Sequence, residues 1–186
     1  FSTKGAWNSI RESAPPMGWA NLVWHPFRIS KHAFSLWLAI LGAHRTMDRL
    51  LTLGIVTSAR CSFNCGDIET VEHLFFACPY TQYIWIKVLN MCNINRQMLS
   101  WPEEIQWMVE HARGKKLPQT LRKLAFGATV YHIWMERNRC FKNCFLPQES
   151  VIHKIQGDVA AKLTGLSLEN SNEHHHSLCT NWGMIN

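Results

Sequence analysis

The sequence predicts a mainly α-helical protein, and three observations support that fold class. Apolar residues recur at helical spacing in several segments, and residues that begin or end helices stand beside them. The C-terminal half shows no alternating strand pattern. Hydrophobic residues make up 47% of the 186-residue chain, which is enough for a packed core.

The first expected helices lie in the N-terminal third. Residues 31–41 are apolar nearly all round, so we expect a buried helix whose core residues include Phe34 and Leu36. A two-turn helix should follow over residues 47–53. Gly54 stands where a glycine commonly ends a helix.

Further helices follow beyond residue 70. A short helix carries His73, and Ser100 with Glu103 forms a capping box that begins a later helix. Gly127 predicts a close helix–helix crossing in the longest helix. The longer helices are expected at about 79–91, 101–112, 118–144 and 148–166.

Three cysteines and one histidine within eighteen residues predict a metal site: Cys61, Cys65, His73 and Cys78. Three thiolates and one imidazole are the ligands of a closed tetrahedral zinc site, which leaves no position for a substrate. One structural zinc would staple a small helical domain, followed by a helical extension. His73 and Cys78 stand about 140° apart on an ideal helix, so the helix must break before Cys78. Pro79 favours that break.

Two alternatives remain at the cysteines. Three reduced, buried cysteines with His73 on a helix surface would also fit the pattern. Cys140 and Cys144 stand one helical turn apart and suggest either a second metal half-site or two unlinked thiols. We favour unlinked thiols because no histidine is near in sequence, although folding could bring His132 and His153 to them.

Several motifs stand in a recognisable order over residues 5–90. They are Lys31-His-Ala-Phe-Ser-Leu-Trp37, Thr46-Met-Asp-Arg-Leu50, the cysteine pair, and Glu69-Thr-Val-Glu-His73-Leu-Phe-Phe-Ala-Cys78-Pro79. This order resembles the plant reverse-transcriptase zinc-binding domain, which follows the polymerase in LINE-type (non-LTR) retrotransposon proteins. Tyr131-His-Ile-Trp-Met-Glu-Arg-Asn138 is similar to the helical segment that often follows the domain.

The resemblance implies a zinc ion on Cys61, Cys65, His73 and Cys78. It also implies the reverse-transcriptase domain of a parent protein as a partner, within an active element or its genomic remnant. Family members often have two residues between the first two cysteines, whereas this chain has three.

The net charge of +6 and the pI of about 9.1 favour a nucleic-acid partner, either RNA or DNA. The abundant aromatic residues leave a protein–protein interaction module as the alternative. Basic residues that converge on one face would favour nucleic acid, and an exposed apolar patch would favour a protein. The candidate nucleic-acid contacts are Arg45, Arg49, Arg60, Lys115 and Lys116.

The sequence argues against an enzyme and against a small-molecule substrate. Its three aspartates, Asp48, Asp67 and Asp158, are scattered, whereas a polymerase needs aspartates that converge on Mg²⁺. No phosphate-binding glycine loop or hydrolase motif is present. We therefore expect an accessory module without catalysis.

The domain boundaries expected are 1–92 for the zinc-binding-like domain and 93–166 for the helical extension. Residues 167–186 read as a disordered tail that contains three consecutive histidines. Seven cysteines without a signal-peptide pattern indicate an intracellular protein, nuclear or cytoplasmic and not secreted. The longest apolar run is too short for a membrane span. Phe1 at the start suggests a fragment of a longer reading frame.

Overall fold

The computed structural model describes residue 9 and residues 17–140, 145–165 and 173–184, and the mainly α-helical class is confirmed for them. Apart from an isolated bridge between Arg60 and Ile68, these ranges contain no β-structure. None of their helices has both the length and the apolar character that a bilayer span needs. The elements are α2 (Ala20–Val23), α3 (Ser30–Ile40), α4 (Met47–Thr52), η1 (His73–Ala77), α5 (Pro79–Met91), α6 (Trp101–His111), α7 (Leu117–Cys140), α8 (Gln148–Thr164) and α9 (Glu173–Asn181).

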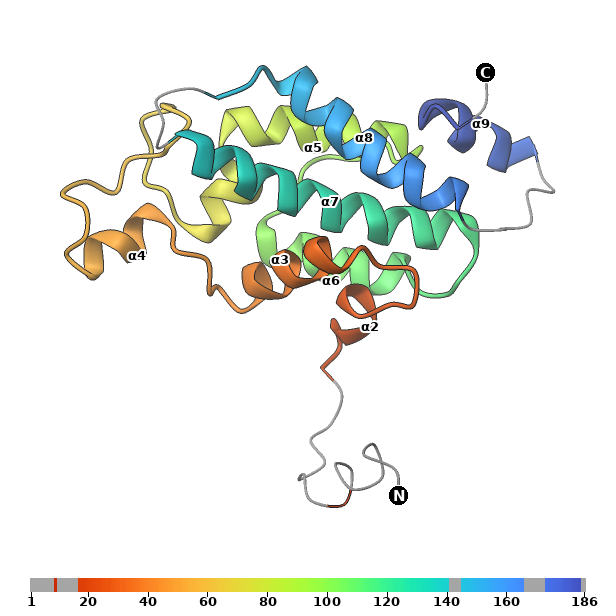
Figure 1. Cartoon of the computed structure of the whole chain (residues 1–186), viewed down its shortest axis with the longest axis horizontal. Helices are drawn as coiled ribbons and strands as arrows, with labels where there is room; N and C mark the ends of the chain where they lie inside the picture. The colour runs from red at the N-terminus through yellow and green to blue at the C-terminus, as the bar shows by residue number, and fades with distance from the viewer. Residues whose placement is uncertain (1–8, 10–16, 141–144, 166–172, 185–186) are drawn as a thin grey trace.

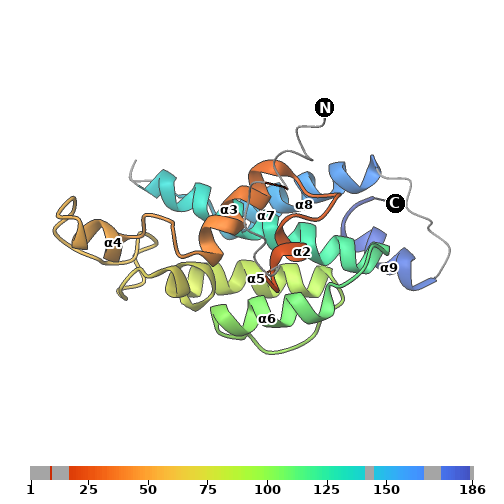
Figure 2. The ribbon, with the colours of Figure 1, turned by 90° about the horizontal axis from the view of Figure 1, so that it is seen from below.

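The long helix α7 forms the centre of the molecule, and the other elements surround it (Figures 1 and 2). It contacts α2, α3, α5, α6, α8, α9 and η1. Helices α5 and α8 lie on one side of it, and α3 and α6 lie on the other (Figure 1). Helix α4 projects at one end of the molecule, whereas α9 lies at the opposite end. Helix α7 therefore runs from one end of the molecule towards the other.

A group of stacked aromatic rings fills the core. The ring of Phe76 lies 5.0 Å from that of Trp85, and the ring of Trp101 lies 5.1 Å from Phe75 and 5.9 Å from Phe126. Each large ring removes much apolar surface from water, and offset pairs add a further attraction. The rings come from η1, α5, α6 and α7, so the segments 1–92 and 93–166 share one hydrophobic core.

Helix α3 is less buried than its composition predicts. Leu36 is buried as expected, but Phe34 is 52% exposed. The buried face contains His32 and Ser35 instead. Among the described elements, α3 packs mainly against α2 and α7, and the side that carries Phe34 stays exposed.

Gly127 lies where α7 crosses α3, as the sequence predicts. A Cβ atom at Gly127 would lie 3.6 Å from the Cβ atom of His32. The absence of a side chain therefore allows the two helices to approach closely, and it places His32 directly against α7.

The C-terminal segment differs from its prediction. Residues 167–186 were expected to form a disordered tail, but they contain α9, which contacts α7. Leu178 and Trp182 are buried, and the indole Nε1 of Trp182 donates to the Met91 carbonyl at 3.0 Å. The segment is polar on average, yet its few apolar side chains share one face and dock together.

We expect Trp182→Ala to destabilise the protein by about 3–5 kcal/mol, because it empties a fully buried aromatic site. Urea unfolding followed by circular dichroism would measure the loss. His176→Ala alters an exposed residue of α9, the helix that directly precedes Trp182, and should change the unfolding free energy by less than about 0.5 kcal/mol. Equal stability of both variants would show that the segment is not docked.

Candidate metal centre

Cys61, Cys65, His73 and Cys78 converge, with their potential ligand atoms all within 4.8 Å of one another. The Sγ atoms of Cys61 and Cys78 are 3.7 Å apart, and Cys65 Sγ lies 3.2 Å from His73 Nε2. Two thiolates that bind one tetrahedral zinc at about 2.3 Å lie about 3.8 Å apart. The spacing of Cys61 and Cys78 therefore fits a shared zinc ion, and only Cys65 of the four is not fully buried.

A tight loop, residues 61–69, places the first two cysteines, and we name it the metal-site loop. The Cys61 N–H donates to the Asp67 carbonyl at 2.8 Å, and the Asn64 N–H donates to the Cys61 carbonyl at 3.0 Å. Gly66 adopts a φ of 98°, which a residue without Cβ reaches with little strain. Asn64 also has a positive φ, 59°. The loop thus accommodates three residues between the cysteines and still brings Cys61 and Cys65 to the cluster.

A π-helical turn, η1, places His73 and Cys78. The Cys78 N–H donates to the His73 carbonyl at 2.8 Å, five residues earlier, whereas an α-helix joins residues four apart. Cys78 itself is extended, with φ −72° and ψ 132°. The predicted break before Cys78 is therefore confirmed, and the widened turn brings both side chains to one site.

The surroundings of Cys78 favour its thiolate, the form that binds metal. A hydrogen bond from Cys61 lowers the pKa of Cys78, and the backbone N–H groups of Tyr80 and Thr81 lower it further although burial opposes them. Cys78 is the N-cap of α5, where the helix dipole also favours negative charge. The same hydrogen bond raises the pKa of Cys61. Of the two thiols, Cys78 is therefore the one whose thiolate form is favoured.

The imidazole of His73 presents Nε2 toward Cys65. Its other nitrogen, Nδ1, lies 4.0 Å from the carboxylate of Asp67. In metal sites a carboxylate near the second ring nitrogen commonly orients the imidazole. Asp67 is exposed, so its effect on His73 is weak.

Glu69 is a buried carboxylate between three segments of the chain. Its Oε1 accepts hydrogen bonds from the Met47 N–H at 3.0 Å and the Arg137 Nε–H at 2.8 Å. Its Oε2 accepts one from the Ser62 N–H at 3.0 Å. Glu69 therefore ties the metal-site loop to the start of α4 and to α7.

Sequence reasoning placed Glu69 and Arg137 in two motifs without predicting that they meet. They form an ion pair in which the two side chains are 0% and 2% exposed. No local periodicity links residues 68 positions apart. Neither motif singles these two residues out, because Glu72 stands near Glu69, and Glu136 and Asn138 flank Arg137.

The structure does not bring the five predicted nucleic-acid contacts together. Arg45, Arg49 and Arg60 are exposed in the segments around the metal site. Lys115 and Lys116 are exposed in the loop that precedes α7. Helix α7 has 24 residues and spans about 36 Å, and its far end contacts the metal-site loop. The basic residues therefore form two groups at opposite ends of α7.

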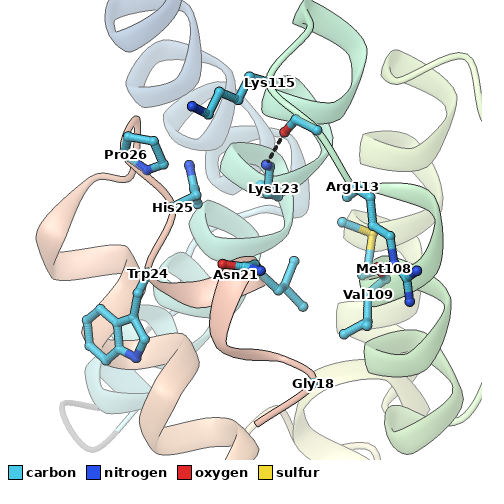
Figure 3. A pocket seen from close by; sticks show the side chains of 13 residues that line it. Gly18, Asn21, Trp24, His25, Pro26, Met108, Val109, Arg113, Lys115 and Lys123 are labelled. Atoms are coloured by element: carbon cyan, nitrogen blue, oxygen red, sulfur yellow. Dashed lines mark hydrogen bonds between the residues drawn. The ribbon is translucent and has the colours of Figure 1, made fainter. Parts of the chain in front are cut away.

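A pocket of about 560 Å³ lies between α2 and the α6–α7 loop (Figure 3). Arg113, Lys115 and Lys123 line it, and none of the described residues that line it is acidic. His25 and Lys123 lie close together in Figure 3, with Trp24 at an edge. We name this site the basic pocket.

Cys140 does not join the cysteine cluster. Its Sγ lies 3.4 Å from the Glu136 carbonyl, and burial raises its pKa to about 12. Cys144 lies outside the described residues. His132 contacts Asp158 instead of a cysteine.

The comparisons with known proteins agree with the metal site. Residues 1–85 match the family described as zinc-binding in reverse transcriptase. An uncharacterized mitochondrial protein of Arabidopsis thaliana is 27% identical over 99 residues, which cover 52% of this chain and 69% of that protein. No solved structure matches the chain significantly. The resemblance to the plant reverse-transcriptase zinc-binding domain is therefore confirmed for the N-terminal part of the chain.

We expect Co²⁺ bound in place of zinc to show the strong near-ultraviolet absorption of thiolate coordination, and Cys78→Ser to weaken it. The reason is that Cys78 supplies one of three sulfur ligands and the readiest thiolate. Cys92→Ser is the matched control, because Cys92 is a buried thiol outside the cluster. Unchanged absorption in Cys78→Ser would contradict the ligand set.

We expect Arg137→Met to destabilise the protein by about 3–5 kcal/mol, since it leaves the buried Glu69 carboxylate without its cation. Chemical denaturation of the zinc-loaded protein would measure the change. Lys87→Met removes an exposed charge from α5 and should alter stability by less than about 0.5 kcal/mol. A loss below 1 kcal/mol in Arg137→Met would show that the pair is dispensable.

Proposed function

We propose that this chain, whose residues 1–85 match the zinc-binding family of reverse transcriptases, is an accessory module of a retrotransposon reverse transcriptase that binds single-stranded RNA or DNA. The basic pocket supports this proposal more than any other feature. Its described lining residues include three cationic side chains and no acidic one. Such a concave, positively charged surface favours phosphate groups.

We propose that one zinc ion, held by Cys61, Cys65, His73 and Cys78, has a structural role. Four protein ligands complete a tetrahedral coordination shell, so no open position remains for substrate. When bound, the ion would supply a rigid cross-link between the loop and the π-helical turn. The zinc ion would affect nucleic-acid binding only by stabilising the folded protein.

Two buried groups in the basic pocket favour an anion. Lys123 is 7% exposed, and its Nζ donates to the Gly114 carbonyl at 2.7 Å. His25 is 5% exposed, and its buried Nδ1 has no hydrogen-bond partner among the described groups. Burial, together with the charge of Lys123, lowers the pKa of His25 to about 4, so the imidazole is neutral at pH 7. A phosphate would offset the buried positive charge and could bond to both groups.

A second candidate function is supported by exposed apolar residues near the metal site. Leu51, Leu53 and Ile55 are 43%, 62% and 60% exposed and lie within five residues of one another. Such a group suits a protein partner, and we propose the reverse-transcriptase domain of the parent protein. Leu53→Ser should then weaken association with that domain, and because it adds no charge beside Arg49 it should leave nucleic-acid binding unchanged.

We also propose that the chain is intracellular and not an enzyme. Thiolate ligands require a reducing compartment, and the localisation of a tagged chain in the nucleus or cytoplasm would test this. Among the described residues, the cysteine cluster contains no carboxylate, and the other group of potential metal ligands, His32, His132 and Asp158, contains one. We therefore expect no polymerase or ribonuclease activity with Mg²⁺ or Mn²⁺ in assays of the purified chain. Activity that Asp158→Asn abolishes would contradict the proposal.

We expect weak binding to single-stranded oligonucleotides that depends steeply on salt. Each phosphate contact contributes about −0.7 to the slope of log K against log salt, so three to five contacts give roughly −2 to −3.5. Replacing Lys115 and Lys116 by Gln should flatten the slope by about 1.4, and the Arg45→Gln, Arg49→Gln pair by about 0.7–1.4. Fluorescence anisotropy over a salt series would measure each slope.

Lys87→Gln serves as the control, because Lys87 is an exposed lysine on α5 and is not one of the five predicted contacts. Its slope should equal that of the wild type. Binding that is indifferent to salt, or absent at low salt, would reject nucleic-acid binding and favour the protein-interaction function.

A further inference from the structure

A second group of potential metal ligands lies outside the cysteine cluster, on three helices that pack together. It consists of His32 on α3, His132 on α7 and Asp158 on α8, and their potential ligand atoms lie within 4.8 Å of one another. Both histidines present Nε2 to the same carboxylate oxygen, Asp158 Oδ2, each at 3.0 Å. Residues 126 positions apart are thus joined at one atom.

The helix packing fixes both imidazoles in place. The close crossing at Gly127 holds His32 against α7, and the ring of His32 lies 4.7 Å from the ring of Tyr131. The rings of His32 and His132 lie 5.6 Å apart, edge to face. His32 is 2% exposed. The two nitrogens are therefore held by packing before any ligand arrives.

The charge state of the group suits a metal ion. Burial lowers the pKa of His32 to about 4 and also lowers the pKa of His132, so both rings are neutral at pH 7. Burial raises the pKa of Asp158, but the hydrogen bond from His132 and nearby positive charges leave it below its usual value. Two neutral imidazoles and one carboxylate can bind a divalent cation once the ring proton of each histidine lies on Nδ1, because an Nε2 that donates to Asp158 has no free lone pair.

The distances also suit a metal ion. Ligand atoms bound at about 2.1 Å and at right angles to one another lie about 3.0 Å apart. This is the separation that each histidine nitrogen has from Asp158 Oδ2. The ligand atoms of the two histidines lie within 4.8 Å of each other, so one ion can be shared by all three residues.

We infer that His32, His132 and Asp158 form a second metal site, which binds a divalent first-row transition metal ion such as Zn²⁺ or Co²⁺ with two imidazoles and one carboxylate. Such a donor set leaves coordination positions open, unlike the closed cysteine site. A hollow of about 440 Å³, lined by His132, Asp158 and Lys154, adjoins the group and gives solvent and ions access to it.

Two lysines face the site and compete with the ion. Lys31 Nζ lies 3.3 Å from Asp158 Oδ2 and 5.1 Å from the centre of the Tyr131 ring, and Lys154 lines the hollow. Lys31 is 51% exposed, so its ion pair is weak and an arriving cation can displace it. Removal of Lys31 should therefore strengthen metal binding, whereas a purely hydrogen-bonded group would bind no metal in either form.

The test counts metal ions on the full chain by native mass spectrometry after loading with excess Zn²⁺. His174, His175 and His176 are replaced by Gln in every sample, so that the histidine run cannot supply an extra ion. The chain that carries only these three replacements is the background, and it should bind two ions. The same chain with Asp158→Asn added should bind one. Asp158→Asn should weaken the second Co²⁺ dissociation constant by more than about 100-fold, since even second-shell changes cost 10–100-fold.

Two further measurements separate loss of the site from loss of the fold. Asp158→Asn should retain the Co²⁺–thiolate absorption and the circular dichroism of the background, because the cysteine site is separate from it. Lys31→Ala should bind the second Co²⁺ ion at least as tightly as the background does. A single bound ion in both the background and Lys31→Ala would overturn the inference. So would a second ion that persists in Asp158→Asn.

Discussion

The buried ion pair between Glu69 and Arg137 is the constraint on which the arrangement of the two halves depends. A carboxylate without exposure is stable only when its oxygens are bonded, and Glu69 receives donors from the metal-site loop, α4 and α7. Any movement of the loop away from α7 would leave a buried charge unpaired. The zinc-binding segment is therefore held as part of the helical core.

The zinc ion would hold its own loop and turn in place, whereas the Glu69–Arg137 ion pair connects that loop to α7. Zinc would fix the side chains of Cys61 and Cys78, and thus the shape of one loop and one π-helical turn. Glu69 stands between these two pieces in the sequence and transmits their position to α7. From there, α7 runs to the basic pocket, where Lys123 stands 14 residues from Arg137, about 21 Å along the helix. The metal site thus supports a distant surface through one helix.

Features that depend on residues close together in the sequence were predictable. Contacts between residues far apart in the sequence were not. The five-residue step from His73 to Cys78 excluded a continuous helix, and the structure resolves it with a π-helical turn. Gly127 predicted its crossing because a glycine inside a helix allows another helix to approach closely, whichever helix that is. By contrast, His32 and Asp158 meet through the packing of three helices, which no spacing encodes. Trp182 was missed because a polar average concealed one buried face.

The most direct test of the account is hydrogen exchange of the zinc-loaded protein before and after chelation. The coupling through Glu69 and Arg137 predicts that chelation exposes amides in the metal-site loop and also in the last turns of α7, residues 130–140. In Arg137→Met the α7 amides should exchange quickly whether or not zinc is bound. Exchange that increases in residues 58–80 alone, with α7 fully protected after chelation, would contradict the account.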